Sequence, residues 1–177
     1  MDDLRLEPFG EQHLAGVEAM LADPDLLRFT RIPEPAPPGY ARHWLRRYEE
    51  GRRDGTKEAF AIVDGGATFL GLALAPGIER EEAQAELGYV VAPEARGRGV
   101  ATRALGLLTD WALGERGLER LTLLISTENE ASKTVAARNG YVFEGVLRSL
   151  AFKQGRREDT ELWSLLPADR AAAATRT

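Results

Sequence analysis

The spacing of apolar residues changes several times along the chain, and each change marks a new structural element. Alternation at every second position indicates a half-buried strand, and apolar residues three or four positions apart indicate one face of a helix. This pattern predicts strands over residues 4–9, 58–64, 67–75, 85–91, 120–126, 141–152 and 159–166. It predicts helices over residues 11–22, 40–51, 100–115 and 129–138.

Glycine and proline separate these elements. Gly65-Gly66 lies between two apolar runs and predicts a hairpin, and Asn139-Gly140 is suited to a left-handed helix cap. The proline-rich link over residues 32–38 cannot be regular helix or central strand. The order β-α-α-β-β-β-α-β-α-β-β predicts one α/β domain over residues 1–167 with a mixed central β-sheet, followed by a frayed tail over residues 168–177.

Composition favours a single globular domain and excludes several chemistries. The chain has 177 residues, 44% of them hydrophobic, which suits one domain with a substantial core. The absence of cysteine excludes a disulfide framework, thiolate metal ligands and a cysteine nucleophile. His13 and His43 lie on separate expected helices at no ligand spacing, so no metal site is indicated.

Charge and hydropathy narrow the expected partners and location. Lys and Arg together number 23 against 28 Asp and Glu, and the net charge of −5 argues against nucleic acid as a general partner. The N-terminus lacks the basic and apolar regions of a signal peptide, and no apolar run approaches the ~18 residues that span a bilayer. We therefore expect a cytoplasmic protein that does not enter a membrane.

A strand, a glycine-containing loop and a helix follow one another between Val90 and Arg103. Such a junction leaves backbone N–H groups free at the helix start, where they can bind an anion. Helix starts usually attract Asp or Glu, yet residues 96–109 contain three arginines and no acid. Gly97 and Gly99 would let the backbone approach a phosphate closely. We interpret the segment as an anion site, with a solvated basic turn as the alternative.

Other phosphate-binding loops fit this segment less well. The Walker pattern requires a Gly-Lys-Ser/Thr ending, which is absent here. A Rossmann loop would be expected near the first strand, with three glycines at a different spacing. Nucleotide triphosphate hydrolysis and dinucleotide redox chemistry are therefore disfavoured.

Two motifs resemble those of a known family. Arg96-x-x-Gly99-x-Ala101, preceded by the segment 88–91, resembles the acetyl-CoA signature of the GNAT acetyltransferases. The block 129–132, followed by the segment 139–145, resembles the branch that contains the RimJ/RimL-type ribosomal-protein N-acetyltransferases. The resemblance covers nearly the whole chain. It implies a single GNAT-type domain whose sheet, flanked by helices, is splayed at the acetyl-CoA site.

The resemblance also implies acetyl-CoA as cosubstrate, without a metal. Pantetheine would lie between the strand that ends near Val91 and the strand over residues 120–126, with the pyrophosphate on the glycine loop. The implied cofactor-binding residues are Val91, Arg96, Gly97, Arg98, Gly99, Val100, Ala101, Thr102, Asn129 and Ser132. Asn129 and Ser132 could instead cap the short helix, a role that does not exclude contact with the cofactor.

One position departs from the family pattern. Many GNAT enzymes carry a tyrosine seven residues after the motif asparagine, where its hydroxyl can protonate the departing sulfur, but this chain has Ala136 there. In the RimJ/RimL-like branch the serine of the Asn-x-x-Ser block is the usual substitute. The resemblance therefore implies Ser132 as the candidate general acid.

The absence of cysteine favours direct attack of an amine on the thioester in a ternary complex over an acyl-enzyme. A protonated acceptor must first lose a proton, since a lysine-type amine has a pKa near ~10.4 and an α-amino group near ~8. Glu86, on the strand before the loop, is the candidate base, although a solvent-facing strand glutamate explains it equally well. The alternative to an N-acetyltransferase is a non-catalytic acyl-CoA sensor or scaffold of the same fold.

The acceptor wall is expected from the first two helices and the proline link. Its aromatic residues fit core packing more simply than ligand contact, and its arginines, where they face the cleft, would favour a peptide or an amino-acid-like amine over a polyamine. These residues are Phe29, Tyr40, Trp44 and Tyr48, and Arg28, Arg31, Arg42, Arg46 and Arg47. The sequence leaves open the acceptor, the acyl chain and the oligomeric state, for which a homodimer is possible.

Overall fold

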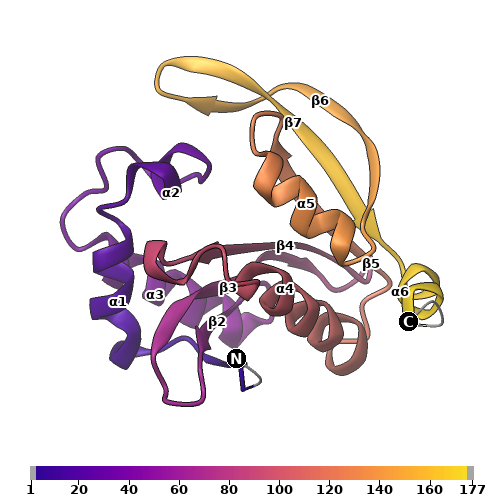
Figure 1. Ribbon diagram of the computed structural model, residues 1–177. Helices are drawn as coiled ribbons and strands as arrows, with labels where there is room; N and C mark the ends of the chain where they lie inside the picture. The colour runs from indigo at the N-terminus through magenta and orange to yellow at the C-terminus, as the bar shows by residue number, and fades with distance from the viewer. Residues whose placement is uncertain (1–2, 175–177) are drawn as a thin grey trace.

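A single seven-stranded sheet forms the centre of the protein, in a computed structural model that describes residues 3–174 (Figure 1). The strands lie in the order β1-β2-β3-β4-β5-β7-β6. They are β1 (Arg5–Pro8), β2 (Glu58–Val63), β3 (Phe69–Glu79), β4 (Gln84–Val91), β5 (Arg120–Ser126), β6 (Val142–Lys153) and β7 (Arg156–Leu165). All neighbouring pairs are antiparallel except β4 and β5, so the sheet is mixed as expected.

Among residues 3–174, six α-helices and three shorter turns accompany the strands. The helices are α1 (Leu14–Met20), α2 (Pro24–Arg28), α3 (Tyr40–Asp54), α4 (Val100–Asp110), α5 (Glu130–Arg138) and α6 (Pro167–Ala174). The turns are η1 (Glu11–His13) and η2 (Pro93–Ala95), which are 3-10 helical, and η3 (Trp111–Glu115), which is π-helical. Every element expected from the sequence is present, with boundaries shifted by a few residues at most ends. Within the described range no helix is long and apolar enough to cross a bilayer.

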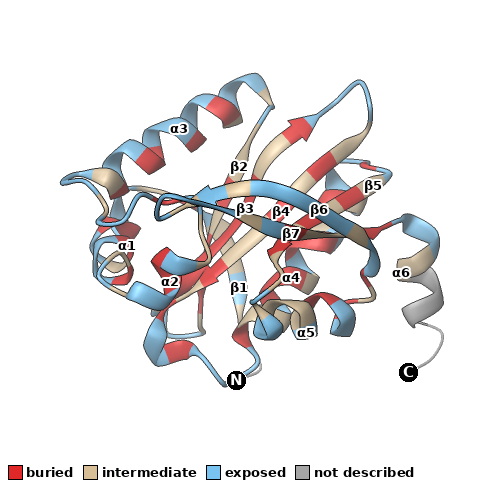
Figure 2. Cartoon of the chain, turned by 90° about the horizontal axis from the view of Figure 1, so that it is seen from above, coloured by how far each residue is buried: buried red, intermediate tan, exposed pale blue. Residues whose placement is uncertain are grey.

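Helices cover both faces of the sheet, and each face has its own hydrophobic core. One core packs α1 and α3 against the sheet, with Trp44, Leu45 and Tyr48 of α3 buried in it. The other packs α4 and α5 against the opposite face, around Leu105 and Leu108. Figure 2 shows the buried residues of α3 on the side that faces the strands. The burial of Trp44 and Tyr48 confirms that these two aromatic residues belong to the core.

Two helices were not expected from the sequence. The helix expected over residues 11–22 stops before Asp23-Pro24, and this pair begins a second helix: the Asp23 carboxylate caps α2 by accepting hydrogen bonds from the N–H groups of Asp25 and Leu26 at 3.2 and 3.1 Å. An acid followed by proline is as good a helix start as a helix stop.

The expected frayed tail also contains a helix. Residues 168–174 belong to α6, and residues 175–177 lie outside the described residues. Asp169 accepts a hydrogen bond from the N–H of Leu166 at 3.0 Å, and Arg170 donates one to Asp110 of α4 at 2.7 Å. These contacts fix the start of α6 against the domain, which the alanine-rich sequence did not reveal.

Candidate active site

The sheet opens between its two parallel strands. β4 and β5 are in register only at Gln84, Ala85 and Glu86, opposite residues 120–122. Beyond this point β5 stays paired with β7 as far as Ser126, and β4 stays paired with β3 as far as Val91. The two strands therefore part after Glu86, which leaves a gap in the sheet at the place where the family resemblance implies pantetheine.

The glycine loop follows the free end of β4. Gly97 and Gly99 have φ angles of +70° and +77°, and a side chain at either position would meet no atom within 4 Å. Gly99 is the N-cap of α4 and has no side chain to bond the amides of the first turn. In the described chain no acceptor bonds the amides of residues 97–102, and the first turn of α4 contains no acid. The loop thus presents unsatisfied N–H groups to open space, an arrangement that fits a diphosphate.

Arg96 is engaged within the protein. Its guanidinium donates to the carbonyl of Val91 at 3.2 Å and forms a short ion pair with Asp23, the residue that caps α2. Partial burial opposes ionisation of Asp23, but the hydrogen bond and charge of Arg96 outweigh it and lower the pKa of that carboxyl. Arg96 therefore joins the loop to α2, whereas Arg98 is exposed and makes no ion pair with another described residue.

The remaining loop residues lie on α4. Val100 is buried in the core, and Ala101 is half-buried. Thr102 is half-buried, and its carbonyl accepts a hydrogen bond from the side-chain amide of Asn139 at 3.1 Å. That bond links the start of α4 to the residue that ends α5.

Ser132 lies in the first turn of α5, on the other side of the gap. Asn129 caps this helix, and its side-chain oxygen accepts a hydrogen bond from the N–H of Ser132 at 3.0 Å. The Ser132 hydroxyl lies 2.9 Å from the hydroxyl of Tyr89 on β4. Ala136 has no hydroxyl, and its methyl group is fully buried against the core. Sequence reasoning missed Tyr89, because no spacing rule joins a strand residue to a helix residue 43 positions away.

Glu86 lies at the last paired position of β4, where the gap begins. Its side chain is 29% exposed and forms an ion pair with Arg31, with 3.2 Å between Oε1 and Nη2. Arg31 itself is 72% exposed, so the pair lies at the mouth of the site. Tyr48 lies nearby, and its burial raises its pKa to about 12, with a small contribution from the Glu86 charge. Glu86 thus faces α3 and the segment after α2, on the side of the sheet where the acceptor wall is expected.

The tip of the β6–β7 hairpin reaches back to that segment (Figure 1). Lys153 donates a short hydrogen bond to the carbonyl of Ile32, and Gln154 donates one to Glu34 at 2.7 Å. Arg28 of α2 forms an ion pair with Glu128, just after β5, at 2.7 Å. These contacts connect α2 and the proline link to the end of β5 and to the β6–β7 hairpin, on the other side of the gap.

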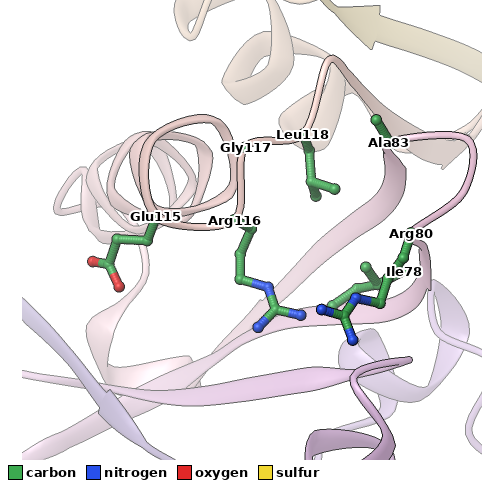
Figure 3. Close-up of a pocket in the computed structure, with 7 residues that line it drawn as sticks. All are labelled: Ile78, Arg80, Ala83, Glu115, Arg116, Gly117 and Leu118. Atoms are coloured by element: carbon green, nitrogen blue, oxygen red, sulfur yellow. The ribbon is translucent and has the colours of Figure 1, made fainter.

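A hollow of about 300 Å³ adjoins this bridge, at the carboxyl end of β5. Its lining includes Thr127 and Glu128 together with Arg157 and Asp159 of β7, so both acidic and basic side chains line the hollow. A hollow of about 320 Å³ lies elsewhere, where Arg80 and Arg116 point toward one another (Figure 3). It is at the amino ends of β4 and β5, opposite the glycine loop, and is not part of the gap. No group of His, Asp and Glu among residues 3–174 could hold a metal.

The family model described as acetyltransferase (GNAT) domain matches residues 3–142. The chain is 30% identical to the putative ribosomal N-acetyltransferase YdaF of Bacillus subtilis over 142 residues, which cover 80% of this chain and 70% of the relative. It is 29% identical to the uncharacterised N-acetyltransferase YoaA of the same organism over 89 residues, half the length of either protein.

A solved structure shares the whole fold. The spermidine N-acetyltransferase from Vibrio cholerae, in complex with CoA and spermine, superposes with a TM-score of 0.85 over 97% of this chain and 99% of the other. The sequence identity is 20%, so this likeness concerns the fold.

Proposed function

The chain belongs to the acetyltransferase (GNAT) family and is an acetyl-CoA-dependent N-acetyltransferase, and on that premise we propose that it acetylates a peptide N-terminus or an amino-acid-like amine by direct attack in a ternary complex. The family model matches residues 3–142, a range that includes both the glycine loop and the Asn-x-x-Ser block on which the resemblance rests. The observation that carries the proposal is the gap between β4 and β5, which has the unsatisfied amides of the glycine loop at one end and Glu86 at the other.

The residues of the gap fit acetyl-CoA. The amides of residues 97–102 would hold the pyrophosphate, with the exposed guanidinium of Arg98 beside them. The backbone of β4 near Val91, which has no partner on β5, would bind the pantetheine amides. Asn129 and Ser132 would line the opposite side. Acetyl-CoA supplies the acetyl group as a thioester.

Glu86 is the proposed base. It lies at the mouth of the gap on the acceptor side and removes a proton from the amine, directly or through water. Its ion pair with the exposed Arg31 is worth less than ~1 kcal/mol, so an arriving amine can displace the arginine cheaply. A hydrogen bond from Ser132 supports the departing sulfur, which suffices because a thiol of pKa near ~8.5 leaves well as thiolate. A backbone N–H near Val91 would meet the carbonyl oxygen.

Release of free thiol from acetyl-CoA in the presence of an amine tests the activity directly. Turnover of any amine excludes the sensor or scaffold alternative, for which the missing tyrosine at Ala136 is the main argument. A folded protein that binds acetyl-CoA but acetylates no peptide, amino acid or small amine would favour that alternative.

The charges of the acceptor wall support a peptide-like acceptor. Arg28 and Arg31 both reach the gap, where they pair with Glu128 and Glu86. A polyamine would bring further cations to a region that these arginines already neutralise, whereas a peptide offers carbonyl groups that Arg31 can bind. The relatives include both a putative ribosomal enzyme and a spermidine enzyme, so their names do not decide the acceptor.

Competition between a short neutral peptide and spermidine tests this acceptor class. We expect the larger kcat/KM for the peptide, and Arg31→Ala should shift the ratio toward spermidine. Arg42→Ala is the matched control, since Arg42 pairs with Glu11 and lies outside the gap. A larger kcat/KM of the wild-type protein for spermidine would contradict the proposal of a peptide-like acceptor.

We also propose a homodimer formed through β6. Eight large hydrophobic residues are exposed among those described, and six lie on β6: Val142, Phe143, Val146, Leu147, Leu150 and Phe152. Their exposures reach 66% for Phe152, and β6 is the last strand in the sheet order, so no further strand of the described chain pairs with its free edge. Neighbouring positions of a strand point to opposite faces, so this edge presents apolar side chains on both of its faces. Exposed apolar clusters of this kind mark protein–protein interfaces.

Light scattering after gel filtration tests the dimer, for which we expect twice the chain mass of 19.4 kDa. Val146→Lys should yield a monomer, and Leu107→Lys, on α4, is the matched control with a similarly exposed side chain. A monomeric wild-type protein at micromolar concentration would contradict the proposal.

A further inference from the structure

One hydrogen bond joins the two sides of the gap. Tyr89 extends from β4 and Ser132 from α5, and their hydroxyl oxygens lie 2.9 Å apart. The ring of Tyr89 packs against the core beneath α4 and α5, so its hydroxyl is fixed by packing. Ser132 is fixed as well, because its N–H bonds the side chain of Asn129.

The chemistry of the two hydroxyls decides which of them donates. Burial raises the pKa of Tyr89 to about 12, against the opposing effect of its bond to Ser132, so the phenol stays protonated at any working pH. A phenol is a stronger donor than an alcohol, and no other described residue bonds the Tyr89 hydroxyl. Tyr89 therefore donates to Ser132 Oγ, which leaves the serine's own hydrogen free to point elsewhere.

The geometry points to Tyr89 as a positioning residue that turns the Ser132 hydrogen toward the departing sulfur, and this inference rests on the proposed function. The N–C bond forms as the C–S bond breaks, the electron pair goes to sulfur as thiolate, and the amine's proton goes to Glu86 or water. Tyr89 keeps its proton. Its phenol has a pKa of about 12 and the departing thiol one of ~8.5, so the equilibrium for proton transfer from the phenol to the thiolate is unfavourable by roughly three powers of ten. The strand tyrosine thus compensates for the hydroxyl that is missing at Ala136.

Tyr89→Phe removes the hydroxyl and keeps the ring. We expect kcat to fall about three- to tenfold, the usual range for one neutral hydrogen bond, with acetyl-CoA affinity unchanged by calorimetry. In a Ser132→Ala background the same change should cause no further loss, because the bond acts only through that serine. Tyr141→Phe is the matched control: it removes a buried phenol that bonds Thr109 at 3.0 Å in the same core, and kcat should not change.

The outcomes separate this inference from the proposed function. A wild-type rate for Tyr89→Phe, or losses that add fully in the double variant, would overturn the positioning role while wild-type turnover still supports the acetyltransferase. A weaker acetyl-CoA affinity in Tyr89→Phe with kcat unchanged would also overturn it, since the tyrosine would then support binding only. If the wild-type protein acetylated none of the amines tested, the proposed function itself would be contradicted.

Discussion

Gly99→Val should weaken acetyl-CoA binding by at least a hundredfold. Gly99 has a φ of +77°, and its missing side chain leaves open space in front of the amides of residues 97–102. A branched side chain there would stand between those amides and a phosphate and would strain the left-handed backbone. Loss of two hydrogen bonds to a charged group, at about 1.5–3 kcal/mol each, amounts to at least a hundredfold in Kd.

Backbone strain alone can be measured with a matched variant. Gly117 also has a positive φ, +62°, with no atom near its missing side chain, but it lies at the opposite end of β5 from the loop. Gly117→Val should therefore lower the melting temperature to a similar extent and leave the acetyl-CoA Kd, measured by calorimetry, unchanged. An unchanged Kd in folded Gly99→Val would refute the phosphate-loop assignment. Equal losses of affinity in both variants would assign the effect to strain.

Three further predictions concern single side chains. Glu86→Gln should lower kcat with little change in acetyl-CoA affinity, and the loss should be largest at low pH, where the acceptor is protonated. A variant with the wild-type kcat at every pH would show that Glu86 is not the base. Arg98→Ala should weaken acetyl-CoA binding by ~1–3 kcal/mol, measured by calorimetry, without a change in melting temperature. Hydrogen bonds from Arg120 and Ser164 lower the pKa of Glu144 to about 2, so its stabilising effect is present above the unfolded pKa of ~4.3 and is lost as pH falls toward 2. Glu144→Gln should therefore destabilise the protein to thermal unfolding at pH 7 but not at pH 2, and a constant difference would contradict this.

The fold was predictable because its signals are local. The limits of β5, Arg120–Ser126, coincide with those predicted from its apolar residues, of which Leu121, Leu123 and Ile125 are buried while the residues between them are half-buried. The glycine loop was equally visible, since a strand, two glycines and a helix adjoin in sequence. By contrast, Asp23-Pro24 is locally ambiguous between a helix end and a helix start, and only the packing of α2 decides it.

The contacts that complete the site were not predictable, because they depend on the register of distant strands. Ser132 reaches Tyr89 only because β4 and β5 part after Glu86, so that α5 lies beside the free end of β4. Likewise Lys153 meets Ile32, 121 positions away, only because β6 and β7 are long enough to cross the gap. No periodicity encodes these distances. The contact of Arg96 was unpredictable for the same reason. The resemblance implies that Arg96 binds the cofactor, but in the structure Arg96 pairs with Asp23, because its loop and α2 come together only in the folded chain.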